Sequence, residues 1–153
     1  PLAGAALLSV NDFDKGTILK IGRDLHRLGF RLLATRGTAA SLARVGLPVE
    51  AVNKVSEGSP HIVDLICEGR VQMVINTPLG PRAHSDGVEI RRAAVQHRVP
   101  LLTTMSAAAA AVNGIRALRD RELRVRSLQE HYAAARGSER STSFLPLMER
   151  GST

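Results

Sequence analysis

Hydrophobic and polar positions divide the chain into short apolar runs and longer stretches in which apolar residues recur every three to four positions. The runs are typical of strands buried in a sheet, and the periodic stretches are typical of helices with one buried face. The predicted strands are residues 4–10, 30–35, 48–53, 71–77 and 99–104. The predicted helices are residues 14–28, 38–45, 60–68, 87–98 and 106–118.

This alternation of strands and helices predicts the α/β class. We expect a three-layer α/β/α fold with a five-stranded, mainly parallel sheet and helices on both faces. Residues 71–77 are almost wholly apolar, as in a strand covered on both sides. Residues 78–85 contain two prolines and a glycine, which favours a surface loop, with Ser85 or Asp86 capping the next helix. Pro60 is expected to be the first residue of its helix.

The periodic pattern weakens from Asp120 onward. Residues 122–132 fit either an edge strand or a short helix, and residues 133–153 are polar, mixed and aperiodic. A chain of 153 residues supports one core rather than two. We therefore expect one domain over residues 1–132, followed by a C-terminal tail, residues 133–153, with a mobile end.

Composition narrows the classes of function. The net charge is +7, but the basic residues are scattered and only 3% of the chain is aromatic, so solvated helix faces explain the charge better than a nucleic-acid surface. No apolar run is long enough to span a membrane. The single cysteine, Cys67, has the spacing of a small core residue. We expect no signal peptide and a cytoplasmic setting.

Polar residues follow every predicted strand. Because parallel strands end at the same edge of a sheet, these residues are expected to lie together. Hydroxyls, amides, lysines and the free N–H groups of helix starts together predict an anion site. The residues are Ser9, Asn11 to Lys15, Thr35 to Thr38, Asn53, Lys54, Asn76, Thr77, Thr103 and Thr104.

The segment Thr35-Arg36-Gly37-Thr38 is the centre of this prediction. Gly37 lets the backbone approach a ligand, and Thr38 can present its hydroxyl together with a helix N-terminus. With Lys15 and Lys54 converging on it, a phosphomonoester is the expected occupant. The alternative is that Thr35 merely ends a strand and Thr38 merely caps a helix.

Five segments carry a resemblance to a known family. They are "LLSVNDFDK", "ATRGTAASL", "VNKVSEGSPHIVDLICEG", "VINTPLG" and "IRRAAVQHRVPLLTT", spread over about residues 4–130. In order and spacing they resemble the methylglyoxal-synthase-like domain, in the version found at the C-terminus of the large chain of carbamoyl phosphate synthase.

The resemblance implies a Rossmann-like fold and a regulatory role. In that family the domain is an allosteric module of arginine and pyrimidine biosynthesis. It binds nucleotide monophosphates such as the inhibitor uridine monophosphate (UMP) and the activator inosine monophosphate (IMP), and it does no chemistry. The parent enzyme is a glutamine-hydrolysing ligase. Its synthetase domains use ATP with Mg or Mn, and it has a small glutaminase subunit.

The resemblance also assigns roles to residues. The family's phosphate-holding positions are matched by Lys15, Thr35, Thr38 and Lys54. Its base and ribose end is matched by Asn76, with Ser9 nearby and Asp86 and Thr104 as weaker candidates. Pro78 stands where the enterobacterial pattern has a threonine, so the identity of the effector and the sign of its effect stay open.

Two other function classes compete with a regulator. A free-standing methylglyoxal synthase, a lyase acting on dihydroxyacetone phosphate, needs a carboxylate base beside the phosphate. That enzyme has Gly-Gly-Asp after its third strand, whereas here Ser59 follows Gly58 and Glu57 is displaced. A purely structural or oligomerising domain would bind no phosphate. The histidines have no metal-ligand spacing, so no metal site is expected.

Overall fold

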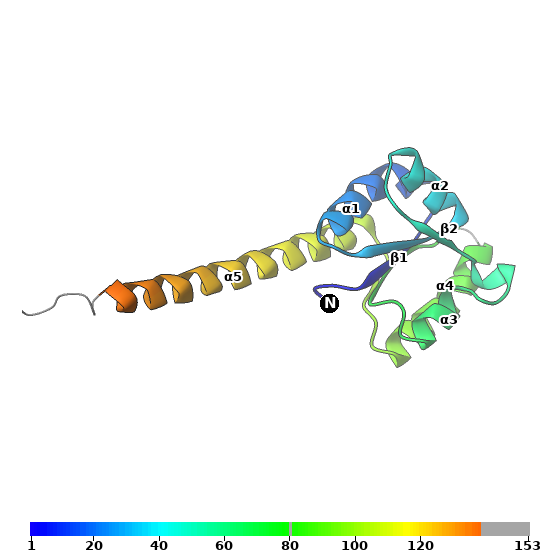
Figure 1. Cartoon of the computed structure of the whole chain (residues 1–153). Coiled ribbons are helices and arrows are strands. Elements are labelled where there is room, and N and C mark those ends of the chain that lie inside the picture. Colours follow the sequence, from blue (N-terminus) through cyan, green and yellow to red (C-terminus); the bar gives the residue numbers. More distant parts are fainter. Residues whose placement is uncertain (80, 139–153) are drawn as a thin grey trace, which may run out of the picture. The chain divides into compact units, whose positions relative to one another are not determined.

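Five parallel strands form the centre of the fold (Figure 1). The computed structural model describes residues 1–79 and 81–138. The sheet order is β3-β2-β1-β4-β5, and every neighbouring pair is parallel. The strands are β1 (Ala5–Val10), β2 (Arg31–Thr35), β3 (Glu50–Val52), β4 (Met73–Thr77) and β5 (Leu101–Leu102). The predicted fold class is confirmed, although β3 and β5 are shorter than expected.

A helix connects each strand to the next strand along the chain, and α5 follows the last strand. They are α1 (Lys15–Arg27), α2 (Arg36–Arg44), α3 (Ile62–Cys67), α4 (Pro81–Gln96) and α5 (Met105–Ser138), with short 3-10 turns at η1 (Asp12–Asp14) and η2 (Val55–Glu57). The chain divides into two units, Pro1–Ala117 and Leu118–Thr153. The sheet, α1 to α4 and the first part of α5 belong to the first unit.

Alternating side chains of the strands build two hydrophobic cores, one on each face of the sheet. Ala6 and Leu8 of β1 point into a core shared with α1, α2 and the first turns of α5. Ala5 and Leu7 point into a second core shared with α3 and α4. Residues of β4 are buried throughout, as their apolar run predicts.

The connection between β4 and α4 is shorter than predicted. The expected loop over residues 78–85 is wrong, because α4 begins at Pro81 and Asp86 lies within it rather than capping it. Proline has no N–H to lose in the first turn of a helix, so Pro81 can start α4 as readily as end a loop. Gly80 lies outside the described residues.

Two further helix starts differ from expectation, and a third agrees with it. Pro60 precedes α3 instead of opening it, since His61 is the N-cap residue and its N–H donates to the Asp64 carboxylate at 2.8 Å. Helix α2 begins at Arg36, so Thr38 sits in its first turn and does not cap it. Helix α1 begins as predicted, with Asp14 as its N-cap residue, although the Asp14 side chain makes no capping bond.

Cys67 is exposed, so its predicted core position is wrong. It is the last residue of α3, and the buried face of that helix is formed by Ile62, Leu65 and Ile66.

Helix α5 is much longer than the sequence pattern predicts. It runs to Ser138, which rules out an edge strand over residues 122–132 and makes residues 133–138 of the expected tail helical. The rest of that tail, residues 139–153, lies outside the described residues. The predicted domain boundary after residue 132 stays a prediction. Among the described helices, none is both long and apolar enough to cross a membrane.

Candidate anion-binding site

The strand register brings the predicted polar residues to one edge of the sheet. Ser9 pairs with Asn76, and Val10 pairs with Thr77. Leu8 pairs with Ala34, so Thr35 comes at the level of Ser9. Because side chains alternate along a strand, Ser9, Thr35 and Asn76 point toward the α3 and α4 side.

A pocket of about 590 Å³ opens at this edge. Its walls come from the end of β1, the η1 and η2 turns, the first residue of α3, the end of β4 and helix α4. The lining side chains are Ser9, Val10, Asn11, Asp12, Phe13, Lys54, Ser56, Glu57, Ile62, Asn76, Thr77, Pro78, Leu79, Asp86 and Ile90.

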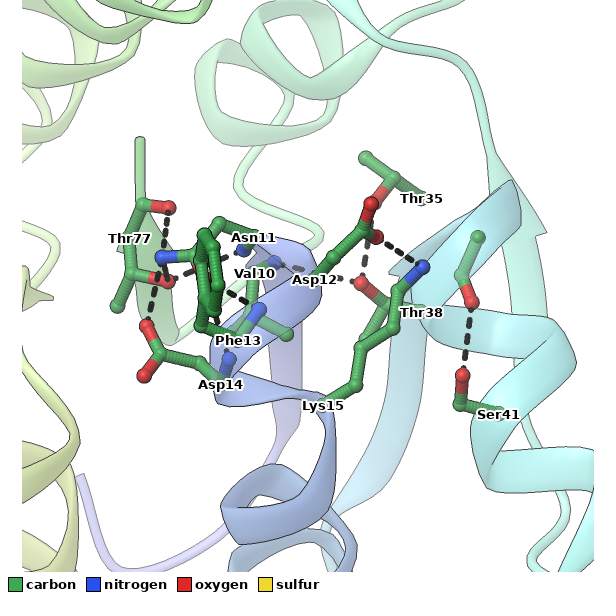
Figure 2. Close-up of polar contacts among 11 residues, drawn as sticks. Val10, Asn11, Asp12, Phe13, Asp14, Lys15, Thr35, Thr38, Ser41 and Thr77 are labelled. Atoms are coloured by element: carbon green, nitrogen blue, oxygen red, sulfur yellow. Dashed lines mark hydrogen bonds and ion pairs between the residues drawn. The ribbon is translucent and has the colours of Figure 1, made fainter. Parts of the chain in front are cut away.

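Asn11 fixes the turn between β1 and α1 (Figure 2). Its Oδ1 accepts hydrogen bonds from the N–H groups of Phe13 (2.9 Å) and Asp14 (3.1 Å). Its Nδ2 donates to the Asp14 carboxylate (2.8 Å) and to the carbonyl and hydroxyl oxygens of Thr77 (both 3.2 Å). Asn11 therefore ties the η1 turn to the end of β4, and this turn forms one wall of the pocket.

Lys15 lies at the other side of the same turn. Its Nζ is 2.5 Å from the Asp12 carboxylate, an ion pair drawn in Figure 2. A Cβ added to Gly37 would stand 3.3 Å from this Nζ, so the ammonium rests against the first turn of α2 in the space that glycine leaves. The hydrogen bond and charge of Lys15 hold the pKa of Asp12 below its ordinary value, and Lys54 adds to the effect. Both lysine charges thus act on one exposed carboxylate.

Thr35 and Thr38 are buried beside this lysine, with 2% and 1% of their surfaces exposed. The Thr35 hydroxyl donates to the Thr38 oxygen at 3.4 Å, and that oxygen also accepts from the Val10 N–H at 3.3 Å. The hydroxyls therefore join β1, β2 and α2, and neither threonine lines the pocket.

Lys54 begins the η2 turn on the opposite wall. Its N–H donates to the Glu57 carboxylate at 2.8 Å, which closes the turn and leaves the Lys54 side chain exposed at the pocket. The Ser56 hydroxyl donates to the Asp86 carboxylate at 3.2 Å, so η2 is also joined to α4.

The structure brings most of the predicted site residues together. Ser9, Lys54, Asn76 and Asp86 line the pocket, and Lys15 and Thr38 contact residues that line it. Thr104 does neither: its hydroxyl accepts from the Ala107 N–H at 3.1 Å and caps α5. Sequence reasoning did not assign Asp12, Phe13 or Ser56 to the site, although the first two lie in the polar turn that it singled out.

The carboxylates around the pocket are each engaged. Asp12 pairs with Lys15, Glu57 accepts from Lys54, and Asp86 accepts from Ser56. Ser59, at the position of the lyase aspartate, does not line the pocket, and its hydroxyl donates to Asp64 at 2.6 Å. No group of three His, Cys, Asp or Glu side chains in the described part of the chain could hold a metal ion.

Fold and site together define a class: a parallel α/β domain with a polar pocket at the carboxyl edge of its sheet, whose charged lining residues are Lys54, Asp12, Glu57 and Asp86. Comparison with known protein families then identifies the domain: the family profile described as "MGS-like domain" matches residues 17–103. The chain belongs to the MGS-like domain family.

The curated relatives are carbamoyl phosphate synthase chains. The chain is 53% identical over 131 residues to the "Carbamoyl phosphate synthase large chain, C-terminal section" of Methanopyrus kandleri, covering 85% of this chain and 24% of the relative. It is 46% identical over 136 residues to the large chain of Gemmatimonas aurantiaca, covering 89% of this chain and 12% of the relative. The chain thus spans a quarter or less of the length of these relatives.

A solved structure supports the fold. Methylglyoxal synthase from Elizabethkingia anophelis superposes with a TM-score of 0.59 at 18% identity, covering 73% of this chain and 78% of that chain. At this identity the similarity establishes the fold alone.

Proposed function

We propose that this chain is the effector-binding regulatory domain of a carbamoyl phosphate synthase large chain, and that its pocket holds a nucleoside monophosphate by the phosphate. The observation that carries the proposal is geometric: Lys15 pairs with Asp12 beside the first turn of α2, and Lys54 lines the same pocket as Asp12. Two cations and a helix N-terminus suit a phosphate dianion better than a single carboxylate.

The pocket is large enough for the remainder of a nucleotide. A volume of about 590 Å³ lies within the range of small-molecule sites. Besides Lys54, its walls carry the Ser9 and Ser56 hydroxyls, the Asn76 amide and the Asp86 carboxylate, which can bond sugar hydroxyls and base edges.

The wider context forms part of the same proposal. The parent enzyme would supply the ATP-dependent ligase chemistry with Mg or Mn and receive ammonia from its small glutaminase subunit, in the cytoplasm, for arginine and pyrimidine synthesis. The domain itself would contain no catalytic site. Regulation requires that UMP or IMP bind two states of that enzyme with different affinity, typically by about 1–3 kcal/mol.

Calorimetric titration tests the site directly. Inorganic phosphate, UMP, IMP and phosphoribosyl pyrophosphate are titrated into the wild type and into Lys54→Ala and Thr38→Ala variants, alone and combined. The matched control is Lys20→Ala, an exposed lysine of α1 outside the pocket lining. The control should bind as the wild type does. Undiminished binding by the combined variant would refute the phosphate site.

The lyase alternative has its own measurement. Because Lys15 lowers the pKa of Asp12 and the other pocket carboxylates are engaged, we expect no turnover of dihydroxyacetone phosphate. Formation of methylglyoxal above background would show that the pocket is catalytic.

A further inference from the structure

Two large apolar side chains are exposed at the mouth of the pocket. Phe13 is 85% exposed and Leu79 is 59% exposed, and both line the pocket. They come from different loops, one after β1 and the other after β4. Neither belongs to a hydrophobic core. A lone exposed apolar residue is ordinary in a protein, but two that converge on one ligand pocket from distant segments are not.

We propose that Phe13, supported by Leu79, is the stacking site for the planar heteroaromatic ring of the bound nucleotide. This inference rests on the proposed function and adds the residue that distinguishes a nucleotide from other phosphate esters. Stacking on an aromatic side chain tolerates any base, because every base has a π-face. Phe13 therefore favours nucleotides of both kinds, purine and pyrimidine, over sugar phosphates.

The turn holds the Phe13 backbone in place without any help from its ring. The Phe13 N–H donates to Asn11 Oδ1 at 2.9 Å, and Asn11 is bonded to Thr77 (Figure 2). The ring itself takes no part in the hydrogen bonds of the turn and stays open to solvent. A ring presented on a fixed backbone loses little conformational freedom when a ligand stacks on it, which favours binding.

The position of Phe13 also fits the position of the phosphate. Lys15 follows two residues later, so the cation and the ring belong to one turn and lie on either side of it (Figure 2). The pocket that Phe13 lines also contains Ser9, Ser56 and Asn76, whose polar groups suit the ribose.

The experiment compares phosphate ligands with and without a heteroaromatic ring. Wild type and Phe13→Ala are titrated with UMP, IMP, ribose 5-phosphate and inorganic phosphate. We expect Phe13→Ala to weaken UMP and IMP binding by about 5- to 30-fold and to leave ribose 5-phosphate and phosphate unchanged. Phe13→Tyr should restore nucleotide binding. The matched control is Val95→Ala, since Val95 is 74% exposed on α4 outside this pocket.

A spectroscopic readout reports the contact itself. The chain contains no tryptophan, so Phe13→Trp introduces its only indole. UMP and IMP should quench its fluorescence, and ribose 5-phosphate should not.

Each failure has a different meaning. Wild type that binds ribose 5-phosphate as tightly as UMP, or Phe13→Ala that binds UMP undiminished, overturns the stacking site and leaves the phosphate site standing. Equal weakening of UMP and inorganic phosphate in Phe13→Ala overturns it too, because the residue would then act only on the shape of the turn. Wild type that binds none of these phosphates overturns the proposed function as well.

Discussion

Replacing Asn11 by alanine should destabilise the whole domain as well as its pocket. The side-chain oxygen accepts two N–H bonds within the η1 turn, and the two hydrogens of its NH2 group are shared among three acceptors, two of them on Thr77 of the neighbouring strand. Alanine removes every one of these bonds. The turn then loses its capping group, and Thr77 loses a donor.

The magnitude follows from two contributions. Loss of a side-chain cap costs about 1 kcal/mol of unfolding free energy. Thr77 is only 5% exposed, so its oxygens lose the amide donor where water has little access, at a cost of about 1–3 kcal/mol. We therefore expect Asn11→Ala to lower the free energy of unfolding by about 2–4 kcal/mol. Asn11→Asp keeps the acceptor but turns a carboxylate oxygen toward the Asp14 carboxylate and the Thr77 oxygens, so it should be no more stable than Asn11→Ala.

Urea denaturation followed by circular dichroism measures this difference. Asn113→Ala is the control, because Asn113 is an exposed residue of α5 with one long contact, 3.5 Å from Arg116 Nη1. Its effect should stay within about 0.5 kcal/mol. If Asn11→Ala is no less stable than Asn113→Ala, then Asn11 does not hold the turn as argued.

Three further predictions concern other contacts. Asp12→Asn frees the Lys15 ammonium, so inorganic phosphate should bind up to about fivefold more tightly by calorimetry, and weaker binding would contradict this. Gly22→Ala places a Cβ 2.8 Å from the buried Leu42 and should cost about 1–3 kcal/mol by urea denaturation, whereas Gly16→Ala, in open space on the same helix, should stabilise by about 0.5–1 kcal/mol. The Ser59 hydroxyl and the His61 N–H lower the folded-state pKa of Asp64. Asp64 therefore stabilises the fold above its unfolded pKa of about 4, and this contribution is lost as the pH falls through the lower folded value. Ser59→Ala should thus be less stable than wild type at pH 7 by thermal melting, and a difference that persists unchanged near pH 2.5 would contradict the mechanism.

The sheet and its two covered faces could be predicted from periodicity because burial itself imposes the pattern. Leu7 and Leu8 point into opposite cores, so both must be apolar. The meeting of Ser9 and Asn76 could be predicted for a different reason. Parallel strands end at the same edge of the sheet, whatever the loops between them do.

The loops could not be predicted, since long-range contacts decide them. The η1 turn depends on bonds between Asn11 and Thr77, which are 66 positions apart, so the place of Phe13 at the pocket is not encoded in its neighbours. Pro81 is ambiguous because proline is typical both of loops and of first helical turns. Helix α5 is longer than predicted because the apolar pattern weakens from Asp120 onward, whereas the helix continues to Ser138.

Helix α1 connects two places that the sheet otherwise separates. Its N-terminal end carries Lys15 and follows the turn that walls the pocket, and further along it Asp24 forms an ion pair with Arg116 of α5 at 3.3 Å. Helix α1 thus joins the turn beside the pocket to the first turns of α5 within the first unit.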